Sequence, residues 1–463
     1  MKIYDTLKGE LVEFKPIKEK EVKMYVCGPT VYNLIHVGNG RPMIVFDAFR
    51  RFLEYTGYKV TMVQNFTDID DKIINKAIEE NVPFEEVSER YITQYWKDAQ
   101  NLNIRASNFH PKTTNYVQEI IKFIEDLIKK GYAYESNGDV YFEVRKFKDY
   151  GKLSHRNIDD MKSGARIEVS DIKKDPLDFA LWKNAKPGEP AWESPWGNGR
   201  PGWHIECSVM SGELLGETFD IHAGGNDLVF PHHENERAQS MARHGKEFAN
   251  YWMHNGMIKV SGDKMSKSIG NIWLIRDVVK EFGADTTKVF ILSKHYRTPL
   301  DFTKEGLEEQ KKSVTRVQNS LIEAEKYFNG TVPFIKNTEY MKQTINNMKE
   351  ALSEDFNTPK VIAKIFEVSK NLNKAITEKN EQQIKENYHL IKNEMGPVLG
   401  IFEKNEVTTN DSKMDKVMEV IINTRKKAKK EKNYEMSDYI REELKKVGII
   451  LKDTPQGMEY TIQ

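Results

Sequence analysis

Cysteine is scarce in this chain of 463 residues, which has only Cys27 and Cys207. A small domain held together by several disulfides is therefore excluded. Long apolar segments are missing too, since no run of about 18 uninterrupted apolar residues occurs and the amino terminus lacks the apolar core and cleavage site of a signal peptide. We expect a soluble, cytoplasmic protein without a membrane partner, in which reduced thiols favour metal binding or catalysis over a disulfide.

A net charge is also missing, because 70 lysine and arginine residues balance 70 aspartate and glutamate residues. The molecule therefore has no overall basic field, and a polyanionic partner must be bound by local patches. No internal repeat or extended low-complexity tract is present. The length exceeds what one hydrophobic core usually supports, so we expect roughly two to four domains.

The first organised region, residues 21–75, has the pattern of a strand, a loop, a helix and a second strand. Alternating apolar residues predict a strand over 22–26, and Lys59 to Gln64 predict another. The helix between them is expected to turn these side chains inward: Ile44, Val45, Ala48, Phe49, Phe52 and Leu53. This βαβ pattern predicts an α/β fold with a parallel sheet, whose ligands bind beyond the carboxyl ends of the strands.

Later regions indicate further elements. We expect helices and an irregular insertion with short strands up to about residue 200. A helical stretch should then begin within 202–207, followed by a strand that ends in a turn over 219–227 and by a helix from Pro231. Apolar residues at helical spacing predict a helical bundle over 305–402. We expect a linker from Lys404 to Ser412, followed by two helices and a closing hairpin.

Two thiols, an imidazole and a carboxylate form a candidate metal site, which consists of Cys27, Cys207, His232 and Glu236. On a helix from Pro231, His232 and Glu236 stand at positions i and i+4 and face the same side. Such a ligand set is typical of tetrahedral zinc. His233, next to His232, is the rival ligand.

Four segments carry a resemblance to a known family: His36-Val37-Gly38-Asn39, Trp203–Ser208, Phe230–Glu236 and Lys264-Met265-Ser266-Lys267-Ser268. In this order they resemble the cysteinyl-tRNA synthetases, a family of class I aminoacyl-tRNA synthetases, over nearly the whole chain. The first segment departs from the class signature HIGH by valine and asparagine. The last one is identical to the second signature, KMSKS.

The resemblance implies that ATP activates L-cysteine, a reaction that mainly needs positioned charge. The catalytic candidates are His36 and Asn39, at the start of a helix suited to phosphate, together with Lys264 and Lys267, which would close over the triphosphate. Lys267 is the first choice among them. Adenosine is expected near the run that comprises Gly224, Gly225, Asn226 and Asp227, and Mg²⁺ should accompany ATP.

One zinc ion per chain would solve a recognition problem. Serine differs from cysteine only by oxygen for sulfur, and a soft thiolate binds zinc far better than a hydroxyl does. In the family the substrate thiolate coordinates this zinc, so the substrate would add as a further ligand or displace one. The resemblance places these residues around the cysteine: Cys27, Thr67, Trp203 and His222.

The acceptor implied by the resemblance is tRNA-Cys, charged at its 3′ end. A basic run over 425–432 supplies local charge on a neutral molecule, with Arg425 and Lys429 as phosphate contacts and Tyr434 as a stacking platform. We expect a monomer. Two alternatives stay open: a cysteine ligase with a small-amine acceptor, and a non-catalytic tRNA-binding paralogue.

Five segments follow from this interpretation. They are the first half of a Rossmann-like catalytic domain (1–120), a connective insertion (121–200), the second half of the catalytic domain (201–304), a helical bundle (305–403) and a small α+β anticodon-binding module (413–463).

Overall fold

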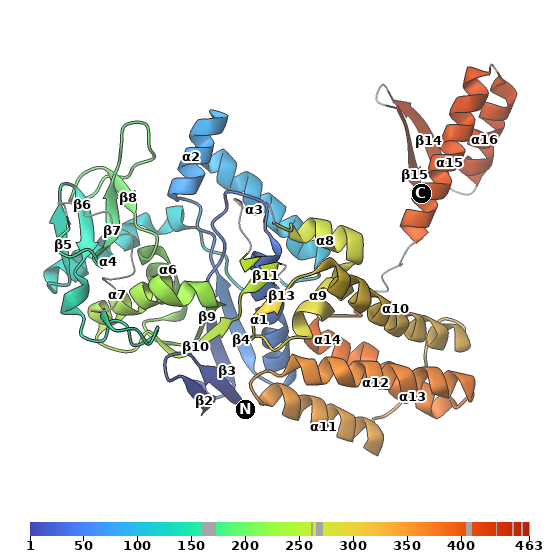
Figure 1. Cartoon of the computed structure of the whole chain (residues 1–463), viewed down its shortest axis with the longest axis horizontal. Coiled ribbons are helices and arrows are strands. Elements are labelled where there is room, and N and C mark those ends of the chain that lie inside the picture. The colour runs from blue at the N-terminus through green and yellow to red at the C-terminus, as the bar shows by residue number, and fades with distance from the viewer. Residues whose placement is uncertain are drawn as a thin grey trace. The chain divides into compact units, whose positions relative to one another are not determined.

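The computed structural model describes residues 1–158, 173–260, 263–264, 272–403, 410–431, 433–446, 449–454 and 457–462. It divides into two compact units, Met1–Glu403 and Lys404–Gln463 (Figure 1). None of the described helices is both long and apolar enough to cross a bilayer.

A parallel sheet with the strand order β10-β9-β3-β4 forms the centre of the first unit. Its strands are β3 (Glu21–Val26), β4 (Lys59–Gln64), β9 (Phe219–Gly225) and β10 (Ala249–Asn255). The crossover from β3 to β4 is α1 (Val37–Tyr55), whose predicted apolar face is buried against the sheet. The predicted βαβ unit and parallel α/β sheet are thus confirmed.

Further elements surround this sheet. A hairpin at the amino terminus consists of β1 (Lys2–Asp5) and β2 (Glu10–Glu13). A small sheet that follows β10 in the chain consists of β11 (Ile258–Val260), β12 (Asp263–Lys264) and β13 (Leu300–Asp301). The helices are α2 (Asp71–Glu80), α3 (Phe84–Asn101), α6 (Ile205–Leu215), α7 (Glu234–His244), α8 (Ile275–Phe282) and α9 (Ala284–Leu292). The short turns before α7 are η3 (Asn226–Leu228) and η4 (Val229–His233).

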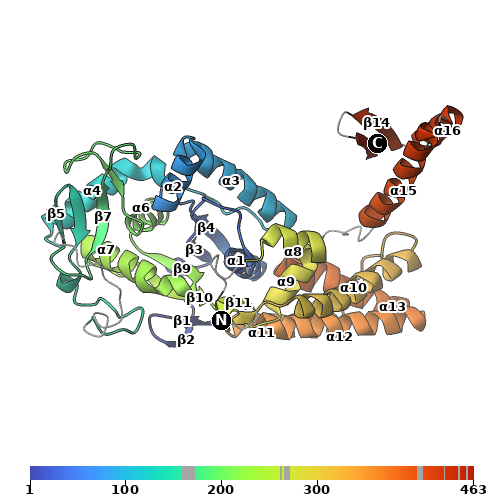
Figure 2. The same cartoon turned by 45° about the horizontal axis from the view of Figure 1, so that its top comes forward.

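The insertion between α3 and α6 has a hydrophobic core that it shares with α6 and α7. Its antiparallel sheet has the order β5-β6-β7-β8 and packs with α4 against α6 and α7 (Figures 1 and 2). The elements are η1 (Thr113–Tyr116), α4 (Val117–Lys129), β5 (Ala133–Ser136), β6 (Asp139–Phe142), η2 (Val144–Lys146), β7 (Phe179–Asn184) and β8 (Gly199–Pro201).

The predicted helical bundle follows the sheet and shares its core, because Phe356 packs against Phe49 and Phe52 of α1. Its elements are α10 (Lys304–Tyr327), α11 (Glu339–Ser353), α12 (Thr358–Thr377), α13 (Glu381–His389), η5 (Leu390–Met395) and α14 (Gly396–Leu399). Several of these helices begin at a residue whose side chain caps the first turn, such as Thr303, Thr338 and Asn357.

The second unit consists of a helix pair and a hairpin, as expected from the sequence. Its elements are α15 (Asn410–Lys430), α16 (Tyr434–Lys446), β14 (Ile449–Thr454) and β15 (Gly457–Ile462). Because α15 begins at Asn410, the predicted linker over 404–412 is too long at its carboxyl end.

Candidate active site and metal centre

A cavity of about 350 Å³ opens at the carboxyl ends of the central strands. Cys27 directly follows β3, and the last residues of β4, β9 and β10 are Gln64, Gly225 and Asn255. All four residues line this cavity. Parallel strands place their carboxyl ends at one edge of the sheet, and this is the edge where α/β folds bind their ligands. The position agrees with the expectation from the βαβ pattern.

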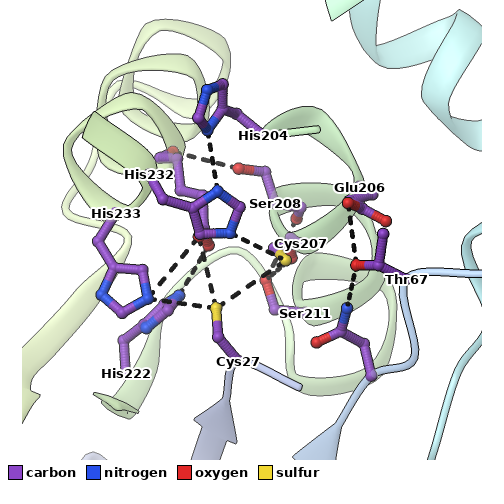
Figure 3. A network of polar contacts seen from close by, with 12 residues as sticks. Cys27, Thr67, His204, Glu206, Cys207, Ser208, Ser211, His222, His232 and His233 are labelled. Carbon is purple, nitrogen blue, oxygen red and sulfur yellow. Dashed lines mark hydrogen bonds and ion pairs between the residues drawn. The ribbon is translucent and has the colours of Figure 1, made fainter. Parts of the chain in front are cut away.

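The predicted metal ligands meet at the base of the cavity. The sulfur atoms of Cys27 and Cys207 lie 3.9 Å apart, and Cys207 Sγ lies 3.7 Å from His232 Nε2. Glu236 Oε1 is 3.5 Å from Cys27 Sγ and 3.0 Å from His232 Nε2. These side chains come from the end of β3, from α6 and from the η4–α7 turn, and all of them are buried (Figure 3).

These separations fit a metal ion with tetrahedral coordination. With Zn–S bonds of about 2.3 Å, two thiolates of a tetrahedral zinc site lie roughly 3.8 Å apart, and sulfur–nitrogen pairs lie slightly closer. Burial raises the pKa of the Cys27 thiol and raises the pKa of Cys207 to about 11. Burial also lowers the pKa of His232, which leaves its imidazole neutral. A central cation would stabilise both thiolates and a neutral imidazole, so the donor set matches zinc.

Further histidines, His204, His222 and His233, lie around this cluster, as Figure 3 shows. His222 Nε2 lies 2.8 Å from Glu236 Oε2, and His204 Nδ1 lies 2.9 Å from His232 Nδ1. On the other side, His233 Nε2 lies 3.2 Å from Cys27 Sγ. Such outer contacts orient metal ligands and set the tautomer of a coordinating histidine.

An alternative ligand set uses Cys27, His222, His233 and Glu236, whose donor atoms also lie close together. The cavity favours the predicted set. Cys27, Cys207 and His232 line it, whereas His222 and His233 are fully buried beneath it. An ion held by the predicted set could therefore meet a small molecule in the cavity.

The residues expected around the substrate differ in position. Thr67 and Trp203 line the cavity, and the Trp203 ring lies over the His232 imidazole with 4.2 Å between the ring centroids. Trp203 is 41% exposed, so it is a wall of the cavity and not a core residue. His222 is placed otherwise than expected, because its ring is buried behind Glu236, where it contacts a candidate ligand.

The nucleotide candidates occupy the other end of the cavity. His36 caps α1, with Nδ1 accepting from the Asn39 amide at 3.3 Å, and both residues line the cavity. Asp227 lines it too, whereas Gly224 is buried. A β-carbon on Gly224 would lie 2.8 Å from the His233 ring, so this glycine makes room for His233.

Of the two predicted catalytic lysines, only one lies within the described residues. Lys264 lies in β12, which pairs with β11 next to the cavity residue Ile258. Lys267 lies outside the described residues.

The predicted RNA contacts differ in how far they are exposed to solvent. Tyr434 begins α16 and is 62% exposed, which suits stacking, and Lys429 is half-buried on α15. Arg425 is different, since it is 2% exposed and donates from Nε to the Ser437 carbonyl oxygen at 3.1 Å. Arg425 is therefore less accessible to a phosphate than predicted, because its guanidinium contacts α16 from α15.

Sequence reasoning missed Glu206, a buried carboxyl that contacts Thr67. It also missed Tyr439, which is as exposed as Tyr434 on the same helix. The sequence offered a signal for Glu206, since an acidic residue directly beside a candidate metal ligand needs a partner when it is buried.

Comparisons with known proteins agree with this geometry. Residues 13–312 match the family described as tRNA synthetases class I (C) catalytic domain, and residues 347–403 match the DALR domain. Methionyl-tRNA synthetase of Mycobacterium tuberculosis, in complex with methionyl-adenylate, has the same fold with a TM-score of 0.60 at 15% identity, over 82% of this chain and 88% of that one. A LeuRS–tRNA–LeuAMS complex of Agrobacterium radiobacter K84 gives a TM-score of 0.63 at 12% identity, over 84% and 85%. The fold and the site define a class I aminoacyl-tRNA synthetase.

Relatives in sequence narrow this class. The chain is 61% identical to the cysteine–tRNA ligase of Petrotoga mobilis, over 100% of this chain and 99% of the relative. It is 58% identical to that of Thermosipho africanus, over 99% and 98%, and 54% identical to that of Thermotoga maritima, over the full length of both. The chain belongs to the cysteine–tRNA ligase family.

Proposed function

We propose that this chain activates L-cysteine with ATP to cysteinyl-adenylate and transfers the cysteine to the 3′ end of tRNA-Cys. The observation that carries the proposal is the buried thiol, imidazole and carboxylate cluster at the base of a cavity that also contains the start of α1. A thiol-selective centre and a phosphate-binding helix start within one cavity are what the activation of cysteine requires.

Cys27, Cys207, His232 and Glu236 would hold one zinc ion. When bound, zinc would supply a soft Lewis acid that prefers a thiolate to a hydroxyl and so separates cysteine from serine. Trp203 walls the cavity above His232 and limits the size of the side chain that enters. Selection by the metal would make a separate editing site unnecessary.

The residues at the other end of the cavity would position ATP. His36 and Asn39, at the amino-terminal end of α1, would donate to phosphate oxygens. Lys264 and Lys267 would neutralise the charge that develops on the leaving pyrophosphate, and Mg²⁺ would accompany the nucleotide. Gly225 and Asp227, which line the cavity, would lie beside adenosine in this arrangement.

The second unit would bind the tRNA. Exposed Lys426, Lys427 and Lys430 on α15 offer phosphate contacts that Arg425 does not, and Lys429 stays a candidate on the same helix. Tyr434 would stack on an unpaired base.

The first experiment is the transfer of labelled cysteine to unfractionated bacterial tRNA by the zinc-loaded protein, with labelled serine in parallel. We expect ATP-dependent charging with cysteine alone. Cysteine-dependent ATP–pyrophosphate exchange without charging would favour a small-amine acceptor. The absence of both reactions would favour a non-catalytic paralogue.

A second experiment separates the two possible ligand sets. We expect His232→Gln to lower the zinc content well below one per chain, because it removes a ligand of the predicted set. His233→Gln, at the adjacent position, should retain zinc and weaken its affinity by roughly 10–100-fold, as loss of an outer contact does. Metal analysis after dialysis against a chelator measures both, and the reverse order would support the alternative set.

A further inference from the structure

Glu206 is a buried carboxyl behind the wall of the cavity, and the proposed chemistry does not use it. It lies in the first turn of α6 and is 1% exposed. Oε1 accepts a hydrogen bond from Thr67 Oγ1 at 3.1 Å, and Oε2 accepts one from the Thr113 hydroxyl. Within the described part of the chain Glu206 forms no ion pair, and its main charged neighbours are the acidic residues Asp68 and Asp70.

The contact with Glu206 determines how the Thr67 hydroxyl can bond. A threonine hydroxyl has one hydrogen and two lone pairs. Its hydrogen points to Glu206 Oε1, and Asn65 Nδ2 donates to its oxygen at 3.3 Å. Oε1 accepts this hydrogen whether or not the carboxyl carries a proton on Oε2. The capacity that Thr67 has left toward the cavity is therefore that of an acceptor.

Asn65 keeps this arrangement from reversing. Its amide is 1% exposed, and Oδ1 accepts from the Gly28 backbone amide at 2.8 Å, which leaves Nδ2 to face Thr67. Gly28 permits this close approach, since a β-carbon on residue 28 would lie 1.7 Å from the backbone carbonyl oxygen of Asn65. With both ends of the amide assigned, Asn65 and Glu206 impose one hydrogen-bond direction on Thr67.

We propose that Glu206 is a positioning residue that holds the Thr67 hydroxyl as an acceptor, so that the pocket selects a substrate carrying an ammonium group beside its thiol. This rests on the proposed function, in which the substrate is cysteine. Cys207 and Glu206 are neighbours on α6, and Figure 3 shows Cys207 pointing to the metal cluster while Glu206 points to Thr67. One helical turn thus serves both the thiol and the α-amino group.

A purely structural role would also explain these contacts, since Glu206 bridges α6, η1 and the segment after β4. The two roles differ in what they do to ligand selectivity. A positioning role acts on ligands that carry the amino group, whereas a structural role weakens all ligands alike. 3-Mercaptopropionate, which is cysteine without its amino group, is the matched probe.

The experiment measures the Kd of L-cysteine and of 3-mercaptopropionate by calorimetry on the full-length, zinc-loaded protein. We expect Glu206→Met, which removes the acceptor at similar volume, to reduce the preference for cysteine over 3-mercaptopropionate at least tenfold. The Kd of 3-mercaptopropionate should change by less than about threefold, with zinc still at one per chain. Glu206→Gln retains an oxygen acceptor and should keep the preference within about threefold of the unaltered protein.

Three results would overturn the proposal: equal weakening of both ligands in Glu206→Met, an unchanged preference, or a loss of preference in Glu206→Gln as large as in Glu206→Met. If Glu206→Met does not fold, Thr67→Val takes its place, and a preference that survives this change also refutes the proposal. An unaltered protein that binds neither ligand would refute the proposed function itself, which is a different outcome.

Discussion

Arg41 is a buried cation whose hydrogen-bond partners are backbone carbonyl groups. Its guanidinium donates to the carbonyl oxygens of Gly256 and Thr298 at 2.7 Å each, and also to those of Met257 and His295. Burial lowers the pKa of Arg41 to about 10, so the side chain stays charged at neutral pH. It joins the first turns of α1 to the loops that follow β10 and α9, beside the cavity.

Arg41→Met should therefore destabilise the protein by roughly 3–5 kcal/mol, because several buried carbonyl groups lose their donors together. The matched control is Arg90→Met on α3, which removes a surface arginine paired with Glu80 and Glu86 and should cost much less, since surface ion pairs add little to stability. Urea unfolding of both variants tests this. Equal losses would show that the Arg41 contacts add little.

At the scale of elements, a buried network of charges joins α1, α9 and the end of the bundle. Arg51 Nε donates to Asp47 at 2.8 Å, and its Nη1 donates to Glu403 at 2.7 Å. Lys288 of α9 donates to the carbonyl oxygens of Gly400 at 2.7 Å and Asn103 at 3.1 Å. This network contacts the last residues of the first unit and joins them to α1, the helix that His36 caps.

Lys288 gives the stability a pH dependence. Burial lowers the pKa of Lys288 from the usual 10.5 to about 8. The carboxylates Asp47, Asp285 and Glu403 oppose this shift, whereas Arg51 lowers the pKa further. Between these two pH values the unfolded chain binds more protons than the folded one. The contribution of Lys288 to the free energy of unfolding therefore rises with pH in this window, and is least favourable below pH 8.

We expect the stability difference between the unaltered protein and Lys288→Met to shift by about 1–2 kcal/mol in favour of the unaltered protein from pH 7 to pH 9.5. Urea midpoints at the two pH values measure this shift. Lys370→Met removes an exposed lysine of α12 and should give a difference that does not depend on pH. A flat difference for Lys288→Met as well would mean that the buried lysine is charged throughout.

At the scale of the whole molecule, the proposed functions are divided between the two units. The hydrophobic core that joins the sheet to the bundle, and the described residues of the candidate active site, belong to Met1–Glu403. The proposed RNA contacts Lys429 and Tyr434 belong to the second unit. Activation of cysteine should thus be separable from recognition of tRNA.

A chain ending at Glu403 should fold, bind zinc and keep cysteine-dependent ATP–pyrophosphate exchange near the level of the full chain. Its charging of tRNA should fall at least about tenfold, because contacts outside the catalytic unit are lost. The full chain with Tyr434→Ala should show the same selective loss in weaker form. Equal loss of exchange and charging in the shorter chain would contradict the division.

Much of the fold could be predicted because the responsible patterns are local. The alternation over 22–26, the apolar face of α1 and the helical spacing after residue 305 depend on neighbours in sequence, and the structure contains each element. Boundaries were less predictable: α15 starts at Asn410, inside the expected linker. The five-segment division of the chain stays a prediction.

The sequence by itself determined the α/β fold, the family, and the residue types of the candidate metal site, because side-chain chemistry and periodicity are written into the chain. Only the tertiary structure decided which of two adjacent histidines faces the cavity, that His222 lies behind Glu236, and that Arg425 is buried. It also brought Glu206 to Thr67, 139 positions away in sequence. Burial and the direction of a hydrogen bond depend on neighbours that only packing brings together, and a pattern of residue types does not contain them.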